Sequence, residues 1–345
     1  MSILRLQIHR RTCVAVVVFV PLFALLFQYR ILGLLNKLGA HVTPIGTKFP
    51  IVLDFQRAPR LLLPFYHTLD YINSIWFSTL LGLFIGGAVI AFLQGFVRRR
   101  LNGNGLSQHI AGVLFGLPNM FCTCCAVNII PGLRRTGAGL GPTLACFVTA
   151  PALNIVVIIL AFELLPVKLA LARLLLGVLA AVGATYFVAM LYPERPREVT
   201  PPEIQADESI GSMLRGWLGH TWGIARTVVP ALLVGFLIIG LFKTLFPPET
   251  IARHFGGGFL STVLASAVGT VLMVPSFTEV LWVGEMTKHG MEPGPAVALL
   301  ITLPAVSFPS LWVLGRVVKS RKVAVSLGIF VLILGVIGGV ISSMI

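Results

Sequence analysis

Three cysteines beside a predicted helix break are the residues best suited to do chemistry in this sequence. The stretch PNMFCTCC at 118–125 places Cys122, Cys124 and Cys125 within four positions. If a helix restarts near Cys122, its free N–H groups favour thiolate, and Cys122 and Cys125 share one helical face. Thiolates bind soft metals and metalloids. Cysteines also pack simply as small apolar residues, so both interpretations stay open.

A carboxylate inside an apolar stretch is the second candidate. Glu279 follows the interruption VPSF at 274–277. An ionisable group at membrane depth is costly and predicts a function, here carrying a proton or pairing with a cation. However, Ser276 and Glu279 also have the spacing of a capping box, in which the carboxylate only secures the helix start.

Two Thr-x-Pro segments place polar side chains in the middle of apolar runs. They read TAPALN at 149–154 and TLPAVS at 302–307. Their polar residues either line a substrate path or satisfy the carbonyls that proline frees. With a residue of the first break, the candidate substrate-binding residues beside the cysteines are Asn119, Thr149, Asn154, Thr302 and Ser307.

A set of membrane helices must position these residues. Seven apolar runs are each long enough to cross a bilayer, at 12–35, 74–97, 143–162, 167–191, 227–246, 295–314 and 323–343. Two further runs, 109–133 and 262–286, are interrupted by proline and predict broken or re-entrant helices. Irregular backbone at this depth is stable only inside protein or beside a cavity. The sequence therefore predicts an all-α polytopic membrane protein with a site at the breaks.

Composition excludes most soluble enzyme classes. Of 345 residues, 57% are hydrophobic and 11% charged, with only 12 acids. The net charge of +14 comes from Lys and Arg at the ends of apolar runs, which is typical of membrane loops and not of a nucleic-acid surface. No phosphate-binding loop or His-Glu-x-x-His motif occurs, and no second Cys or His group has zinc-finger spacing. We predict no enzyme activity, cofactor, bound metal or nucleic-acid partner.

The sequence contains an internal repeat. Shifting it by 153 positions aligns the residues Gly, Pro, Thr, Pro and Ala at 141, 142, 149, 151 and 152 with identical residues at 294, 295, 302, 304 and 305. The glycines at 82, 87, 116 and 137 also recur, at 235, 240, 269 and 290. We predict an N-terminal span and polar connection at 1–73, a first repeat at 74–191, a charged linker at 192–222 and a second repeat at 223–345.

The orientation of the repeats depends on the broken segments. If these segments are re-entrant, the basic clusters near 98–100, 134–135, 195–197 and 316–322 all lie on one side, and the two repeats are inverted. If the segments span the membrane, the repeats are parallel. The charge pattern favours the inverted arrangement. Matched interruptions in duplicated halves are typical of a transporter whose site lies near the bilayer midplane.

The motifs resemble those of the ArsP-type predicted permeases. The resemblance is carried by CTCC at 122–125, RRTGA at 134–138, the Gly-Pro pair at 141–142 and TAPALN at 149–154, and it extends from about residue 74 onward. It implies a polytopic inner-membrane permease, and some members export trivalent organoarsenicals. The sequence departs from the pattern at Ala126, where the group commonly has Gly, and at Ser307.

The predicted function is a secondary transporter whose halves rock about a midplane site. The partners are the bilayer and a small-molecule substrate, which is a thiophilic metalloid or organoarsenical compound. An anionic substrate is the alternative, because the helix N-termini at the breaks attract negative charge. Glu279 is the predicted proton-coupling group. The alternative is a membrane thiol-disulfide carrier that uses Cys122 and Cys125 as its redox pair. The second half has no matching cysteines.

Overall fold

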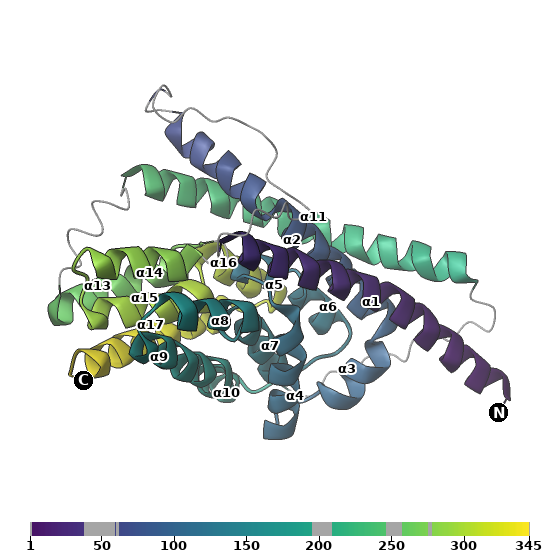
Figure 1. The fold of residues 1–345 in the computed structure, drawn as a ribbon. Helices are drawn as coiled ribbons and strands as arrows, with labels where there is room; N and C mark the ends of the chain where they lie inside the picture. The colour runs from purple at the N-terminus through teal and green to yellow at the C-terminus, as the bar shows by residue number, and fades with distance from the viewer. Residues whose placement is uncertain are drawn as a thin grey trace.

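The computed structural model describes residues 2–37, 59, 62–194, 209–245, 257–274 and 278–344. All regular structure in these ranges is helical (Figure 1), and seven helical runs are long and apolar enough to cross a membrane. The predicted all-α polytopic fold is confirmed. The first half contains α1 (Ser2–Lys37), α2 (Leu63–Phe92), α3 (Gln94–Arg100), α4 (Leu106–Gly116), η1 (Leu117–Asn119), α5 (Thr123–Ala126), α6 (Ile130–Arg135), α7 (Leu140–Ala152), α8 (Ile155–Leu164), α9 (Val167–Val178), η2 (Leu179–Ala184) and α10 (Thr185–Leu191).

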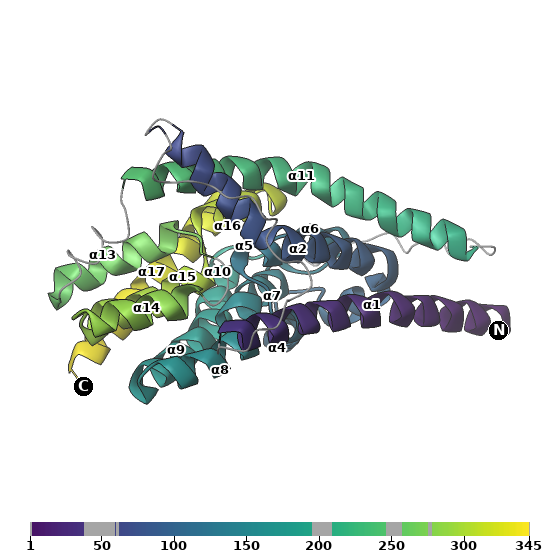
Figure 2. The same ribbon diagram turned by 45° about the horizontal axis from the view of Figure 1, so that its top comes forward.

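The second half follows a similar order. It contains α11 (Ile210–Leu245), α13 (Gly258–Val271), α14 (Thr278–Lys288), α15 (Pro293–Ala305), α16 (Phe308–Val317) and α17 (Arg321–Met344). Figure 2 shows α13, α14, α15 and α17 gathered at one end of the molecule. The spans α7–α8 and α15–α16 are the most enclosed, since 83% of the apolar window of each is buried. The two Thr-x-Pro segments therefore lie in the protein interior.

Two helices begin earlier than hydropathy predicted. Helix α2 starts at Leu63 instead of 74, with Pro64 in its first turn, and α11 starts at Ile210 instead of 227. The turns of α11 that precede residue 227 pack on α2. There the Trp217 indole donates a hydrogen bond to the Phe84 carbonyl at 2.9 Å. Tertiary contact stabilises these less apolar turns, which hydropathy alone assigns to loops. The two polar connections are thus shorter than predicted.

Both broken segments return to the level at which they enter. The two arms of the first, α4–η1 and α5–α6, are bent by 118°. Its ends meet where the Gly139 amide donates to the Leu101 carbonyl at 2.8 Å. The ends of the second meet where the Gly258 amide donates to the Glu292 carboxylate at 3.2 Å. Because the two ends of each segment are in hydrogen-bond contact, both segments have the form of hairpins in the described residues.

Matched glycines end both hairpins. Gly137 and Gly290 have φ of 96° and 95°, in the left-handed region that favours glycine. At the first, the Ala138 amide donates to the Leu133 carbonyl at 2.9 Å, and at the second Met291 donates to Met286 at 3.0 Å. These bonds are Schellman caps, which satisfy the last carbonyls of a helix. The same residue thus performs the same backbone task at positions 153 apart.

Helices α2 and α11 cross through reciprocal glycine contacts. A Cβ on Gly87 would overlap Thr221, and a Cβ on Gly240 would overlap Pro64 and Thr68. Gly87 lies near the end of α2 and Thr68 near its beginning, so the pair of contacts requires the helices to run antiparallel, as Figure 1 shows. Gly87 and Gly240 are 153 positions apart, and so are Thr68 and Thr221. The contact is thus the kind that a two-fold axis perpendicular to both helices produces.

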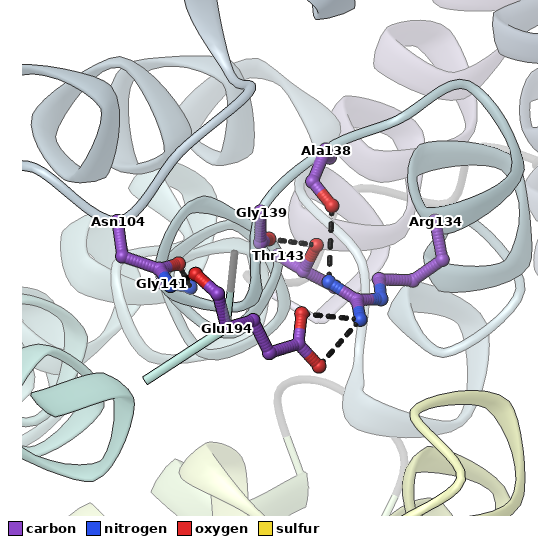
Figure 3. Close-up of polar contacts among 7 residues, drawn as sticks. All are labelled: Asn104, Arg134, Ala138, Gly139, Gly141, Thr143 and Glu194. Carbon is purple, nitrogen blue, oxygen red and sulfur yellow. Dashed lines mark hydrogen bonds and ion pairs between the residues drawn. The ribbon is translucent and has the colours of Figure 1, made fainter. Parts of the chain in front are cut away.

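A cluster of polar contacts fastens the start of the linker to the first hairpin (Figure 3). The buried Arg134 guanidinium donates to both Glu194 carboxylate oxygens, at 2.8 and 2.7 Å, and to the Ala138 carbonyl at 3.0 Å. The Asn104 amide donates to the Glu194 carbonyl and accepts from the Gly141 amide. Both hairpin ends and the start of the linker therefore lie at one membrane face.

Removing the Glu194 carboxylate should destabilise this fastening. Glu194→Gln leaves the buried Arg134 with a neutral partner, and we expect a loss of about 1–3 kcal/mol, limited because the Glu194 side chain is 29% exposed. Thermal unfolding of the detergent-purified protein measures it. Glu285→Gln is the control, since that side chain is 62% exposed. An equal melting temperature for both variants would contradict the structural role of the pair.

The α2–α11 crossing makes a reciprocal prediction. Gly87→Ala and Gly240→Ala should each lower stability by about 1–3 kcal/mol, because the added methyl overpacks a helix contact. Gly219→Ala, on α11 with no atom near the added methyl, should leave stability unchanged or raise it slightly, since alanine favours helix. The melting temperature and the monodisperse fraction after size exclusion report the difference. Similar values for all three variants would show that the crossing is not close-packed.

Candidate functional site

Three buried sulfur atoms form the centre of the candidate site. The Sγ of Cys122 lies 2.7 Å from that of Cys124 and 3.2 Å from that of Cys125, and the last two are 3.7 Å apart. The thiols are free and nearly inaccessible. Within the described residues these three side chains form the one group of Cys, His or carboxylate residues positioned to share a metal ion. The sequence-predicted cysteine cluster thus converges in space.

A break in the first hairpin positions the thiols. Met120 adopts a left-handed conformation with φ of 43°, and Cys122 then caps the single turn of α5, where the Cys125 and Ala126 amides donate to the Cys122 carbonyl. This turn folds the cysteine side chains together. The predicted helix restart is correct in place, but α5 has only four residues, so its dipole is far smaller than that of a long helix.

Residues from α1 and α2 enclose the thiols. The Cys125 Sγ lies 3.4 Å from the Ser78 Oγ and 3.7 Å from the Thr79 Oγ1. The buried Arg30 guanidinium of α1 is close enough to Cys122 to interact with it electrostatically. Sequence reasoning missed these residues. The sequence signal for Arg30 is its position near the end of an apolar run. A cation there usually anchors the helix at the membrane surface, but its side chain can instead fold back into the protein.

The two Thr-x-Pro breaks meet the thiol segment through their last residues. The Asn154 amide donates to the Met120 carbonyl at 3.0 Å, while its carbonyl oxygen accepts from the first amides of α8. Ser307 caps α16 in a capping box with Ser310, and its Oγ lies 3.4 Å from the Thr123 Oγ1. Residues from both halves therefore border the three cysteines.

The other predicted binding residues have contacts that do not involve the three cysteines. The Asn119 amide donates to the Phe115 carbonyl at 2.7 Å, which closes the end of α4. Thr149 packs where Gly116 leaves room, and Thr302 packs in the same way against Gly269. The Thr302 hydroxyl bonds back to the Ala298 carbonyl, whereas the Thr149 Oγ1 has no hydrogen-bond partner within the described ranges. None of these three contacts a cysteine through a hydrogen bond in the described structure.

A buried ion pair connects the two halves near the thiols. A guanidinium nitrogen of Arg173, on α9, lies 3.3 Å from the Glu279 carboxylate on α14, with side chains 1% and 3% exposed. Arg173 also reaches the Ala152 carbonyl at the break after α7, at 3.5 Å. Glu279 is close enough to Cys122 to interact electrostatically. Ser276, the partner in the capping-box interpretation, lies outside the described residues.

Arg173 was not predicted as a site residue, although a cation inside an apolar span is a sequence signal. The residue stands inside the predicted span 167–191, with seven apolar residues among its eight nearest neighbours. The rule that marks an intramembrane charge as functional applies to Arg173 as it does to Glu279. Because a cation in the first half and an anion in the second are 106 positions apart, only the tertiary structure pairs them.

The sulfur geometry allows two kinds of chemistry. Three thiolates at about 2.3 Å from one soft centre are separated by roughly 3.5–4 Å, so the shortest separation, 2.7 Å, must widen by about 1 Å to hold such a centre. A disulfide requires approach to about 2.05 Å, and Cys122 lies nearer to Cys124 than to Cys125. The geometry therefore allows both the binding of a soft centre by the three thiolates and the oxidation of two thiols to a disulfide.

Comparison with known proteins identifies the family of the chain. The chain is 30% identical to the UPF0718 protein YraQ of Escherichia coli over 79% of each chain. It is 23% identical to the UPF0718 protein MJ0584 of Methanocaldococcus jannaschii, over 79% of this chain and 94% of that one. No solved structure matches. Residues 61–344 match the family described as predicted permease, ArsP_1. The chain, with seven helical runs that are long and apolar enough to cross a membrane, belongs to this family of predicted membrane permeases.

Proposed function

We propose that the protein is a secondary transporter built from two inverted halves, with its substrate site at the three cysteines. The antiparallel crossing of α2 and α11, with its reciprocal glycine contacts, supports the inverted arrangement. The two hairpins, each with joined ends, then enter from opposite faces and reach toward the middle. Alternating access consists of rocking one half against the other around the breaks.

The substrate is a thiophilic metalloid compound, such as a trivalent organoarsenical. The observation that carries this proposal is the convergence of three buried sulfurs within 3.7 Å of one another. Soft thiolates prefer soft centres. Asn154 and Ser307 cap the helices around the cluster with hydroxyl and amide groups from opposite halves. A substrate held here contacts the parts that move relative to each other.

Glu279 couples transport to protons through its pairing with Arg173. Guanidinium stays charged in proteins, so protonation of Glu279 breaks the charge balance of the pair. The thiol that binds the metalloid loses its proton to Glu279 and displaces one ligand of the metalloid, which leaves as its anion. An ion pair that joins α9 to α14 also holds the two halves together. Proton transfer at Glu279 thereby links occupancy of the cysteines to the relative position of the halves.

A thiol-disulfide carrier is the second candidate function. The close approach of Cys122 to both neighbouring thiols favours it. Such a carrier needs an external dithiol or disulfide, because the two electrons that Cys122 and its partner release must pass to another disulfide. The second half offers no cysteine for this exchange.

Uptake into everted membrane vesicles distinguishes these functions. We expect wild-type vesicles to accumulate a trivalent phenylarsenical, and Cys122→Ser, Cys124→Ser and Cys125→Ser each to reduce the initial rate by about tenfold or more, as loss of one ligand bond does. Cys146→Ser, which changes a buried thiol outside the cluster, is the control. A redox pair instead requires two of the three cysteines and leaves the third dispensable. Undiminished uptake by the triple-Ser variant would remove the cysteines from the site.

The buried pair gives a separate prediction. Glu279→Gln should abolish the dependence of uptake on an imposed pH gradient, because the amide cannot carry a proton. Arg173→Gln leaves a buried carboxylate unpaired and should lower folded yield, while Arg173→Met with Glu279→Met should restore yield, since apolar replacement of a buried pair is tolerated. Vesicle uptake at several gradients and size-exclusion yield measure the two effects. A gradient response retained in Glu279→Gln would exclude this coupling group.

A further inference from the structure

A cavity of about 430 Å³ opens between α16 and α17, and no cysteine lines it. Its wall is apolar and includes Phe308, Trp312 and Val325, whose side chains are 37%, 43% and 58% exposed. Its rim carries three cations, Arg316, Lys319 and Arg321. An apolar wall under a cationic rim fits an amphiphile with an acyl chain and an anionic head.

The cations of the rim have no acidic partner in the described parts of the chain. The ion pairs found there involve Arg134, Arg173, Lys288 and His289. The Arg316 guanidinium lies over the Trp312 ring, 5.5 Å from its centroid, which fixes its direction at the mouth of the cavity. An aromatic and a cation stacked in this way are typical of the membrane interface.

The backbone holds Lys319 in a conformation that lysine rarely adopts. Its φ is 58°, and the Ser320 and Lys319 amides donate to the Gly315 and Arg316 carbonyls. This is a Schellman cap, the same motif that has glycine at 137 and 290. A non-glycine residue here costs free energy. Lysine in the glycine position thus indicates that the cation itself has a role.

The cavity lies at the basic face of the membrane. The Tyr192 hydroxyl and the Ser326 hydroxyl are 2.9 Å apart, so the start of α17 lies beside the residues that precede Glu194. Glu194 in turn binds Arg134. The rim therefore stands at the level of headgroups in the leaflet where basic loops gather, and anionic phospholipids are drawn to such clusters.

We propose that this cavity binds one anionic phospholipid, with its phosphate on Arg316, Lys319 and Arg321 and one acyl chain along Phe308, Trp312 and Val325. The apolar wall distinguishes a lipid from free phosphate. The cavity runs along α16 from Phe308 to Arg316, so the lipid lies against a helix whose N-cap, Ser307, is near Thr123. The proposal does not depend on which substrate is transported.

Native mass spectrometry of the detergent-purified protein, titrated with phosphatidylglycerol or phosphatidylcholine, tests the site. We expect one phosphatidylglycerol to bind in preference, and affinity to fall about fivefold for each rim cation removed. Lys319→Gly is the decisive variant, because it removes the charge while easing the backbone. It should lose affinity yet melt, without lipid, at the wild-type temperature or above.

Matched controls are available on the same face. The triple variant Arg98→Gln/Arg99→Gln/Arg100→Gln removes three cations from the end of α3, and Lys322→Gln removes an exposed cation that does not line the cavity. Both should keep the preference for phosphatidylglycerol. An equal loss in the controls would reduce the effect to general surface charge, and displacement of the lipid by millimolar inorganic phosphate would make the rim a free-phosphate site. Either outcome would overturn the proposal.

Discussion

The fold depends on hydrogen bonds to the backbone groups that helix breaks leave free, because the core of the bilayer offers no water to bind them. Each hydrogen-bond donor or acceptor left open by a helix break at membrane depth must find a partner in the protein. Asn154 and Ser307 do this at the two Thr-x-Pro breaks, and Asn119 does it at the end of α4. Because Asn154 and Ser307 also contact the cysteine segment, the groups that stabilise the Thr-x-Pro breaks also help to position the cysteines.

Close helix contact makes this arrangement compact enough to enclose the thiols. Glycines at 87 and 240 let the backbones of α2 and α11 approach closely, and those at 116 and 269 leave room for the side chains of Thr149 and Thr302. In lipid, helix association relies on such small residues and close packing, since apolar burial adds little between helices. The glycines that recur 153 positions apart are therefore residues at which these helices pack in close contact.

Charge is confined to positions where it has a partner or reaches a membrane face. Arg173 and Glu279 neutralise each other across the interface of the halves, and Arg134 with Glu194 binds the linker to the first hairpin. A buried pair contributes little net stability compared with apolar packing. The pair joins α9 to α14, and Glu279 is within electrostatic reach of Cys122.

The sequence alone determined the membrane class, most span positions and the three-cysteine cluster, because hydropathy, proline and short spacing act locally. It also identified Gly137 and Gly290 as equivalent, since one backbone conformation selects glycine at both. It placed the starts of α2 and α11 too late, because packing extends helices beyond their apolar cores. Only the tertiary structure brought Arg173 to Glu279 and closed the hairpins, since partners distant in the chain leave no local pattern. Only the tertiary structure also showed that Asn119 bonds to the Phe115 carbonyl and that Thr149 and Thr302 pack against Gly116 and Gly269.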